Sequence, residues 1–185
     1  MSTFNFNGKQ FQISNVEDVV SAGDTGGVTY NGLFVAGKYT AYIKITFKDE
    51  TPEAVCTFGG SSVVGIGNRG SAIKQYGAAC QELYQAIGYY MVQQKAQKIM
   101  DGTPITIAAS AIPKHAENWA LRSDGIVYYR IFKEKIIPKG EFSHCVLKYP
   151  LFHIYTNGKK HLKQPATIDL FKSLCIPEIM ALLYR

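Results

Sequence analysis

Residues 38–48 carry the most regular hydropathy pattern in the chain, and this pattern constrains the fold more than any other feature. The odd positions are apolar or aromatic, namely Tyr39, Ala41, Ile43, Ile45 and Phe47. The even positions hold lysines, threonines and one tyrosine. A period of two is typical of a β-strand with one buried face and one face in water. We therefore expect antiparallel sheets, which commonly expose one face.

Further strands and turns are expected over the first 67 residues. Asn7-Gly8 lies between Phe4–Phe6 and Gln10–Ile13, two segments in which apolar and polar residues alternate, which predicts a two-residue hairpin turn. The remaining expectations are a flexible loop over Ser21–Gly27, turns at Tyr30–Gly32 and Asp49–Pro52, and a strand over Ala54–Val64 that is interrupted at Gly59 and Gly60.

A long helix is expected over Ser71–Met100. Apolar side chains recur there every three or four residues, which places them on one helix face. They are Ile73, Tyr76, Cys80, Leu83, Ile87 and Tyr90. Ser71 is a suitable N-cap residue, and Asp101-Gly102 is a typical helix stop.

A second group of strands follows, and the chain closes with helical segments. Strands are expected over Ile105–Ile112, Gly125–Phe132, Phe142–Tyr149 and Phe152–Thr156, and helices over Thr167–Leu174 and Pro177–Tyr184. Pro177 is placed in the first turn of the last helix, where proline is tolerated. The order strands, helix, strands, helix predicts an α+β fold with two antiparallel sheets. We expect one domain over residues 1–185, with two similar halves at 1–101 and 102–185.

Composition excludes wholesale disorder, because 46% of the residues are hydrophobic and only 18% are charged. No apolar run reaches the roughly 18 residues of a membrane-spanning helix. Met1–Asn5 has neither the basic nor the apolar region of a signal peptide, and the first arginine is Arg69, so no Arg-rich transit peptide is evident. We therefore expect an intracellular protein without a membrane segment; such a compact chain is compatible with a viral or phage origin.

Charge is distributed unevenly along the chain. Residues 1–94 hold six basic and seven acidic side chains, whereas residues 95–185 hold fourteen basic and seven acidic ones. Most of the excess lies between Arg130 and Lys163, where only Glu134 and Glu141 are acidic. A concentrated basic segment attracts polyanions, above all nucleic acid. The competing interpretation is a cationic surface that maintains solubility.

Neither a metal site nor a disulfide framework is expected. The four cysteines lie at positions 56, 80, 145 and 175, without the close-set pairs of structural zinc sites. The four histidines also lack the spacing of helical metal sites.

A glycine-rich segment, Gly65–Gly70, matches the GxGxxG pattern between an expected strand and an expected helix. A dinucleotide site also needs an acidic residue about 20 positions further on. Gly88–Lys95 contains none, so we favour a hinge between sheet and helix. A third interpretation is a phosphate contact at the helix N-terminus, strengthened by Arg69.

Motifs of catalysis are absent from the sequence, which contains neither a P-loop nor G-x-S-x-G. His144-Cys145 cannot act as a nucleophile pair, because adjacent residues of a strand point to opposite faces. Trp119 is expected to anchor packing. We therefore expect a protein that is not an enzyme and that uses no cofactor.

The order of elements and the length of the chain resemble the Whirly family. Within Ala36–Ala41, Gly37 and Lys38 match the central pair of the family's KGKAAL motif, whereas Ala36 and Tyr39 depart from it. The resemblance covers nearly the whole chain in architecture and implies two four-stranded antiparallel sheets that bind single-stranded DNA or RNA. Ile168–Tyr184 looks like the family's closing helices, which implies a homo-oligomer, a dimer or higher, through the C-terminal helix. The departures put higher assemblies in doubt, and the long internal helix is a further departure. The beginning of the chain is also similar to single-strand annealing proteins.

Aromatic and basic residues alternate on several expected strands, where rings can stack on bases and cations can contact phosphates. We expect non-catalytic binding of single-stranded RNA or DNA with little sequence specificity. The expected contact residues are Lys38, Tyr42, Lys44, Arg69, Tyr128, Arg130, Lys148 and Lys160. Replacing Lys44 and Arg130 by Glu is expected to weaken binding without unfolding. The alternatives are a basic face for an acidic protein partner, and an enzyme that holds a nucleotide at Gly65–Gly70.

Overall fold

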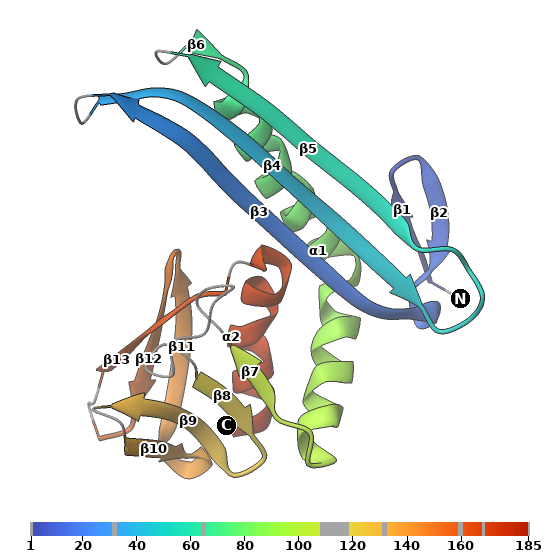
Figure 1. The fold of residues 1–185 in the computed structure, drawn as a ribbon. Coiled ribbons are helices and arrows are strands. Elements are labelled where there is room, and N and C mark those ends of the chain that lie inside the picture. Colours follow the sequence, from blue (N-terminus) through green and yellow to red (C-terminus); the bar gives the residue numbers. More distant parts are fainter. Residues whose placement is uncertain are drawn as a thin grey trace. The chain divides into compact units, whose positions relative to one another are not determined.

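The computed structural model describes residues 2–30, 33–63, 66–107, 119–130, 133–158, 161–167 and 169–184, excepting the side chains of residues 28–30, 33–35 and 129–130. The chain divides into two compact units (Figure 1). Unit 1 comprises Met1–Ile87 and Asp169–Lys172, and unit 2 comprises Gly88–Ile168 and Ser173–Arg185. One boundary between the units therefore falls within the long helix.

Unit 1 begins with a hairpin of β1 (Thr3–Phe6) and β2 (Lys9–Gln12), followed by the 3-10 helix η1 (Ile13–Asn15). Asn7 and Gly8 connect the two strands with φ angles of 49° and 75°. These left-handed conformations are the ones a tight hairpin turn requires, and the turn predicted at Asn7-Gly8 is confirmed.

A four-stranded antiparallel sheet forms the body of unit 1. Its order is β3 (Val16–Tyr30), β4 (Leu33–Phe47), β5 (Ala54–Val63) and β6 (Ile66–Gly67) (Figure 1). The odd residues of β4 from Tyr39 to Phe47 are buried, and the even residues are exposed or half-buried. The predicted strand is therefore confirmed, with an earlier start at Leu33. Asn31 and Gly32, of the turn expected at residues 30–32, lie outside the described residues.

The loop predicted over Ser21–Gly27 is wrong. These residues form the middle of β3 and pair with Gly37–Ile43 of β4. Gly23 fits a crowded part of the sheet, because a Cβ atom there would lie 2.7 Å from the hydroxyl oxygen of Tyr39, whereas one on Gly26 would meet nothing within 4 Å. Close packing, rather than flexibility, accounts for Gly23.

The interruption predicted at Gly59 and Gly60 is also wrong, because β5 runs through both residues. Gly60 instead lets the following helix approach the sheet closely. A Cβ atom at this position would lie 2.8 Å from the Cα of Arg69 and 2.9 Å from the Cβ of Ala72.

The long helix α1 (Arg69–Met100) is confirmed, but it begins two residues before Ser71, so Ser71 lies inside the first turn and is not the N-cap. Tyr76 on α1 packs against Tyr39 and Phe58, with ring centroids 6.2 and 5.7 Å away. The apolar stripe is buried from Tyr76 to Ile87, whereas Ile73 is 40% exposed and lies outside it.

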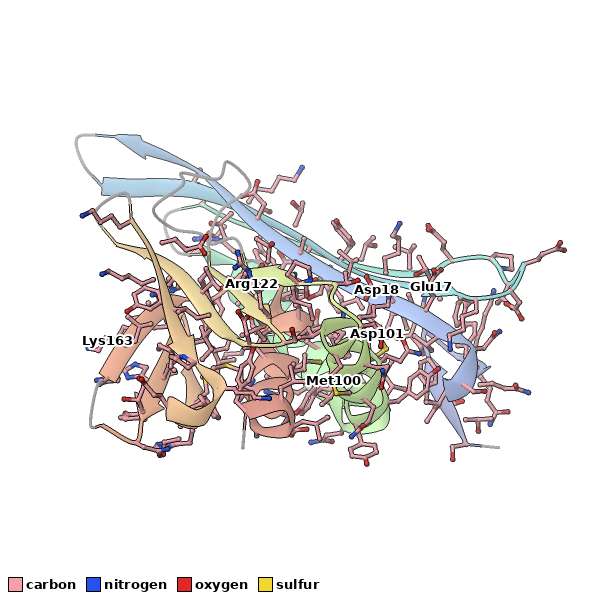
Figure 2. The ribbon with its side chains drawn as sticks, turned by 90° about the horizontal axis from the view of Figure 1, so that it is seen from below. Glu17, Asp18, Met100, Asp101, Arg122 and Lys163 are labelled. Atoms are coloured by element: carbon pink, nitrogen blue, oxygen red, sulfur yellow. The ribbon has the colours of Figure 1, made fainter. Side chains whose placement is uncertain are left out.

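The predicted helix stop is confirmed at the end of α1, where Figure 2 labels Met100 and Asp101. Gly102 has a φ of 93°, and its N–H donates to the carbonyl of Ile99. The N–H of Thr103 donates to the carbonyl of Lys98. This pair of bonds around a left-handed glycine is a Schellman motif, which satisfies the last carbonyls of the helix.

Unit 2 contains two antiparallel sheets. The first has the order β10-β9-β8-β7, built from β7 (Ile105–Ile107), β8 (Trp119–Arg122), β9 (Gly125–Arg130) and β10 (Lys133–Pro138). After the 3-10 helix η2 (Lys139–Glu141), the second sheet has the order β11 (Phe142–Lys148), β12 (Leu151–Thr156) and β13 (His161–Pro165). The four strands predicted in this part are present, although residues 108–112 and 131–132 lie outside the described residues. Three further strands, β8, β10 and β13, were not predicted.

Trp119 anchors the core of unit 2, as predicted. It is 1% exposed, and its ring meets Phe152 edge-on with centroids 5.3 Å apart. Its indole N–H donates a 3.0 Å hydrogen bond to the carbonyl of Pro165. The ring and the hydrogen bond together join β8 to the β12–β13 pair.

A single helix, α2 (Leu170–Tyr184), closes the chain, so the prediction of two helices divided before Pro177 is wrong. Pro177 lies inside α2, where proline costs about 3 kcal/mol because it removes a backbone hydrogen bond. Ile176, Ile179 and Met180 are fully buried around it. Burial of an apolar face stabilises most protein helices more than local propensity does, and here it outweighs the proline.

The α+β class and the antiparallel pairing are thus confirmed. The number of sheets is four rather than the two expected, because the N-terminal hairpin and β11–β13 form sheets of their own. Within the described ranges, neither α1 nor α2 carries an apolar stretch suited to crossing a membrane.

Candidate functional site

The exposed face of β4 presents three of the residues expected from the sequence, Lys38, Tyr42 and Lys44, at alternate positions. Tyr42 is 40% exposed. The ammonium of Lys44 lies 3.0 Å from a carboxylate oxygen of Glu53. An exposed acidic residue, Asp24, lies on the neighbouring strand β3. Acidic groups thus accompany the lysines of this face, which reduces its attraction for a polyanion.

The other expected residues that the structure describes lie on α1, β9 and β11. Arg69 is half-buried at the start of α1. Tyr128 on β9 is half-buried and pairs with the buried Trp119, so its ring borders the core of unit 2. Arg130 ends β9, and its side chain lies outside the described residues, as does all of Lys160. Of the expected residues whose side chains the structure describes, only Lys148 belongs to the surface described next.

The outward face of the β11–β12–β13 sheet gathers imidazole, phenol and ammonium groups. Residues that lie opposite one another on neighbouring antiparallel strands have their side chains on the same face of the sheet. The register of β11, β12 and β13 therefore places nine side chains on the outward face. We call it the histidine face: His144, Val146, Lys148, Leu151, His153, Tyr155, His161, Lys163 and Pro165. Every one of these residues is exposed or half-buried.

A column of three stacked rings crosses the histidine face, with one ring from each strand. Tyr155 is the middle ring. His144 stacks on one side of it with centroids 4.3 Å apart and planes 9° apart. His161 stacks on the other side at 4.6 Å and 4°. Both faces of the tyrosine are therefore covered, and only the outer faces of the two imidazoles can extend the column.

A fourth ring, His153, adjoins the column through His161. The Nδ1 atom of His153 and the Nε2 atom of His161 lie 3.0 Å apart, within hydrogen-bonding distance. Burial, followed by the positive charges of His161, Lys148 and Lys163, lowers the pKa of His153 below its ordinary value. Three of the four histidines of the chain thus lie on one side of one small sheet.

The electrostatics of the histidine face favour anions. Lys148 and Lys163 are exposed on its two outer strands, and Figure 2 labels Lys163 on β13. The segment from Phe142 to Thr167, which contains the whole sheet, has no aspartate or glutamate. Tyr149, in the turn after Lys148, is 63% exposed and provides a further aromatic ring.

The opposite side of the same sheet is mostly apolar, with Gln164 as a polar member. Cys145 pairs with Ile154, whereas its neighbour His144 lies on the histidine face, as strand alternation predicted. Burial raises the pKa of the Cys145 thiol to about 12, so the thiol stays protonated near neutral pH. Across the described ranges, no three His, Cys, Asp or Glu side chains are grouped in a way that would hold a metal ion.

Sequence reasoning missed His144, His153, Tyr155, His161 and Lys163 as members of a site. The patterns considered for the histidines were those of metal sites and, at His144-Cys145, of a nucleophile pair, and β13 was not predicted as a strand. The usable signal was the spacing of two between His153 and Tyr155, and between His161 and Lys163, which places each pair on one face of a strand.

Comparisons with known proteins found no match: no family model, no curated protein and no solved structure matches the chain. The Whirly resemblance and the oligomer that it implies therefore stay predictions.

Proposed function

We propose that this protein binds single-stranded nucleic acid, RNA or DNA, through the histidine face and without catalysis. The observation that carries the proposal is the ring column of His144, Tyr155 and His161, flanked by Lys148 and Lys163 on a sheet without acidic residues. Single-strand binders combine a cationic track for the backbone with aromatic surfaces on which bases stack.

The chemistry assigns a role to each kind of group. The ammonium groups of Lys148 and Lys163 would contact phosphates. The exposed ring of Tyr149 and the outer faces of His144 and His161 would stack on unpaired bases, because every base has a π-face. Bases in a duplex are already stacked on their neighbours, so a single strand is the better ligand. Since neither phosphates nor π-faces carry sequence information, specificity is expected to be low.

The face of β4 is a secondary contact in this proposal. Tyr42 offers one ring, and Lys38 and Lys44 offer two cations, but Glu53 neutralises part of the charge of Lys44. An acidic protein partner would use the lysines of the histidine face but would not require the column of rings. The ring residues therefore distinguish the two functions.

The test is fluorescence anisotropy with labelled single-stranded RNA, single-stranded DNA and duplex DNA over a series of salt concentrations. Two variants are compared with the wild type: Lys148→Gln/Lys163→Gln, and a control with the same loss of charge, Lys9→Gln/Lys74→Gln. Lys9 and Lys74 are exposed residues of unit 1.

The wild type is expected to bind both single strands more tightly than duplex, with log affinity falling linearly with log salt. The Lys148→Gln/Lys163→Gln variant loses two phosphate contacts. Its plot of log affinity against log salt should therefore be shallower than that of the wild type by about 1.4, since each contact contributes roughly 0.7 for single strands. The control variant should retain the wild-type slope. Tyr149→Ala should weaken binding by the roughly 1–3 kcal/mol that one base stack contributes. Absence of binding to every nucleic acid at low salt would overturn the proposal.

A further inference from the structure

His153 and His161 form a hydrogen-bonded imidazole pair at the centre of the proposed binding surface. The two nitrogen atoms lie 3.0 Å apart, and the ring centroids lie 5.0 Å apart. One ring must donate an N–H and the other must offer a lone pair. The pair can therefore hold one added proton and keep this bond, whereas a second proton would replace the lone pair and break it.

The groups that face this pair are cationic or neutral. Lys163 on β13 lies directly opposite His153 in the register of the two strands. Lys148 on β11 adds a second ammonium, and His144 on β11 and Tyr155 on β12 complete the surroundings. These are the titratable side chains that the three strands place on this face. The sheet supplies no carboxylate that could compensate an imidazolium.

A bound phosphate would supply the missing negative charge. Opposite charge close to an imidazole favours its protonated form, and free imidazole already titrates near neutral pH. The lowered pKa of His153, which follows from burial and from the neighbouring cations, means that its imidazole favours the neutral form in the absence of a bound anion.

On the basis of the proposed function, we infer that binding of a phosphate-bearing strand is coupled to proton uptake by the His153–His161 pair, so that affinity rises as pH falls. The coupling is reciprocal: ligand raises the proton affinity of the pair by the same factor by which protons raise the ligand affinity. The histidine face would then adjust its cationic charge to the polyanion that it holds.

The probe for this inference is a labelled oligouridine, because neither uracil nor a phosphodiester titrates between about pH 5 and 8, where histidine does. Affinity is measured across that range at constant ionic strength, with a chelator present, and circular dichroism verifies the fold at each pH. The wild type is compared with His153→Gln/His161→Gln, which removes the titrating pair, and with Lys148→Gln, which removes a charge and keeps the pair.

Uptake of one proton predicts that affinity changes by up to about tenfold per pH unit for the wild type. Lys148→Gln should bind more weakly at every pH and keep this dependence. The double glutamine variant should lose most of this dependence. Calorimetry in two buffers with different ionisation enthalpies then counts the protons taken up.

The outcomes separate the inference from the proposed function. If the wild type binds oligouridine with the same affinity at every pH, proton coupling is wrong and the proposed function stands. If the double glutamine variant keeps the full pH dependence, another group takes up the proton and the assignment to this pair is wrong. If no binding occurs at any pH, both proposals are overturned.

Discussion

The hydroxyl of Ser21 donates a 2.8 Å hydrogen bond to the carboxylate of Asp169, although the two residues are 148 positions apart. The N–H of Lys172 donates to the same carboxylate oxygen, and the N–H of Phe171 donates to the Ser21 hydroxyl. Asp169 thus caps the N-terminus of α2, while Ser21, fully buried, anchors this cap to β3. Both residues belong to unit 1.

Substitutions at Asp169 test the importance of this cap. Asp169→Ala removes the acceptor of two hydrogen bonds and should lower the free energy of unfolding by about 1–3 kcal/mol. Asp169→Asn keeps a side-chain oxygen in the same place and should cost less. Urea denaturation of both variants measures the difference; equal stability of Asp169→Ala and the wild type would show that the cap contributes nothing.

The charge of Asp169 should also make stability depend on pH. Burial raises the pKa of this carboxyl above its ordinary value. The folded protein therefore binds the proton more tightly than the unfolded chain does, and the stability from this group is lost as pH rises through the folded pKa. Asp169→Asn should remove that part of the pH dependence, which urea midpoints in mildly acidic buffers would detect.

Alanine substitutions at Gly60 and at its neighbour Gly59 test whether α1 approaches β5 closely. A Cβ atom at Gly60 would lie 2.8 Å from backbone atoms of Asn68 and Arg69, whereas one at Gly59 meets nothing closer than 4.0 Å. Gly60→Ala should destabilise the protein by about 1–3 kcal/mol through overpacking. Gly59→Ala should stay within about 1 kcal/mol of the wild type. Similar thermal midpoints for the two variants would contradict the close approach of α1.

The exposed face of β4 and the histidine face should differ in their contribution to oligonucleotide binding. Lys44 is partly neutralised by Glu53 at 3.0 Å, whereas no acidic residue lies in the segment that carries Lys163. Lys163→Gln should therefore weaken oligonucleotide binding more than Lys44→Gln does. Anisotropy at one low salt concentration ranks the variants, and a larger loss for Lys44→Gln would move the main interface to β4.

The single tryptophan reports on unit 2. Trp119 is 1% exposed and loses a hydrogen bond to Pro165 when it is replaced by Phe. Trp119→Phe should cost about 2–4 kcal/mol, from the smaller ring and the carbonyl left without its donor. Chemical denaturation followed by circular dichroism measures this loss, and an unchanged midpoint would be inconsistent with the anchoring role.

Local patterns were sufficient to predict several elements. The alternation from Tyr39 to Phe47, the turn at Asn7-Gly8 and the helix stop at Gly102 each depend on residues that are close in sequence. The glycines of β3 and β5 misled the prediction, because at Gly23 and Gly60 the absence of a Cβ atom lets Tyr39 and α1 approach closely. That approach depends on contacts between residues that are distant in sequence.

The candidate site was less accessible to sequence reasoning for the same reason. Lys148 was predicted, but the column of His144, Tyr155 and His161 requires the register between three strands, and one of these was not predicted. Spacing within a strand indicates a shared face, but pairing between strands decides which rings stack. Pro177 shows the same limit, because tertiary burial keeps α2 continuous through it.

The most direct test of the central claim is a two-dimensional amide NMR titration of the full chain with a short single-stranded oligonucleotide. Binding through the histidine face predicts that the largest shifts come from β11, β12 and β13, with strong changes at Lys148, Tyr155 and Lys163. Smaller shifts are expected along β4. Shifts confined to β4, or binding without any change on β11–β13, would contradict the account.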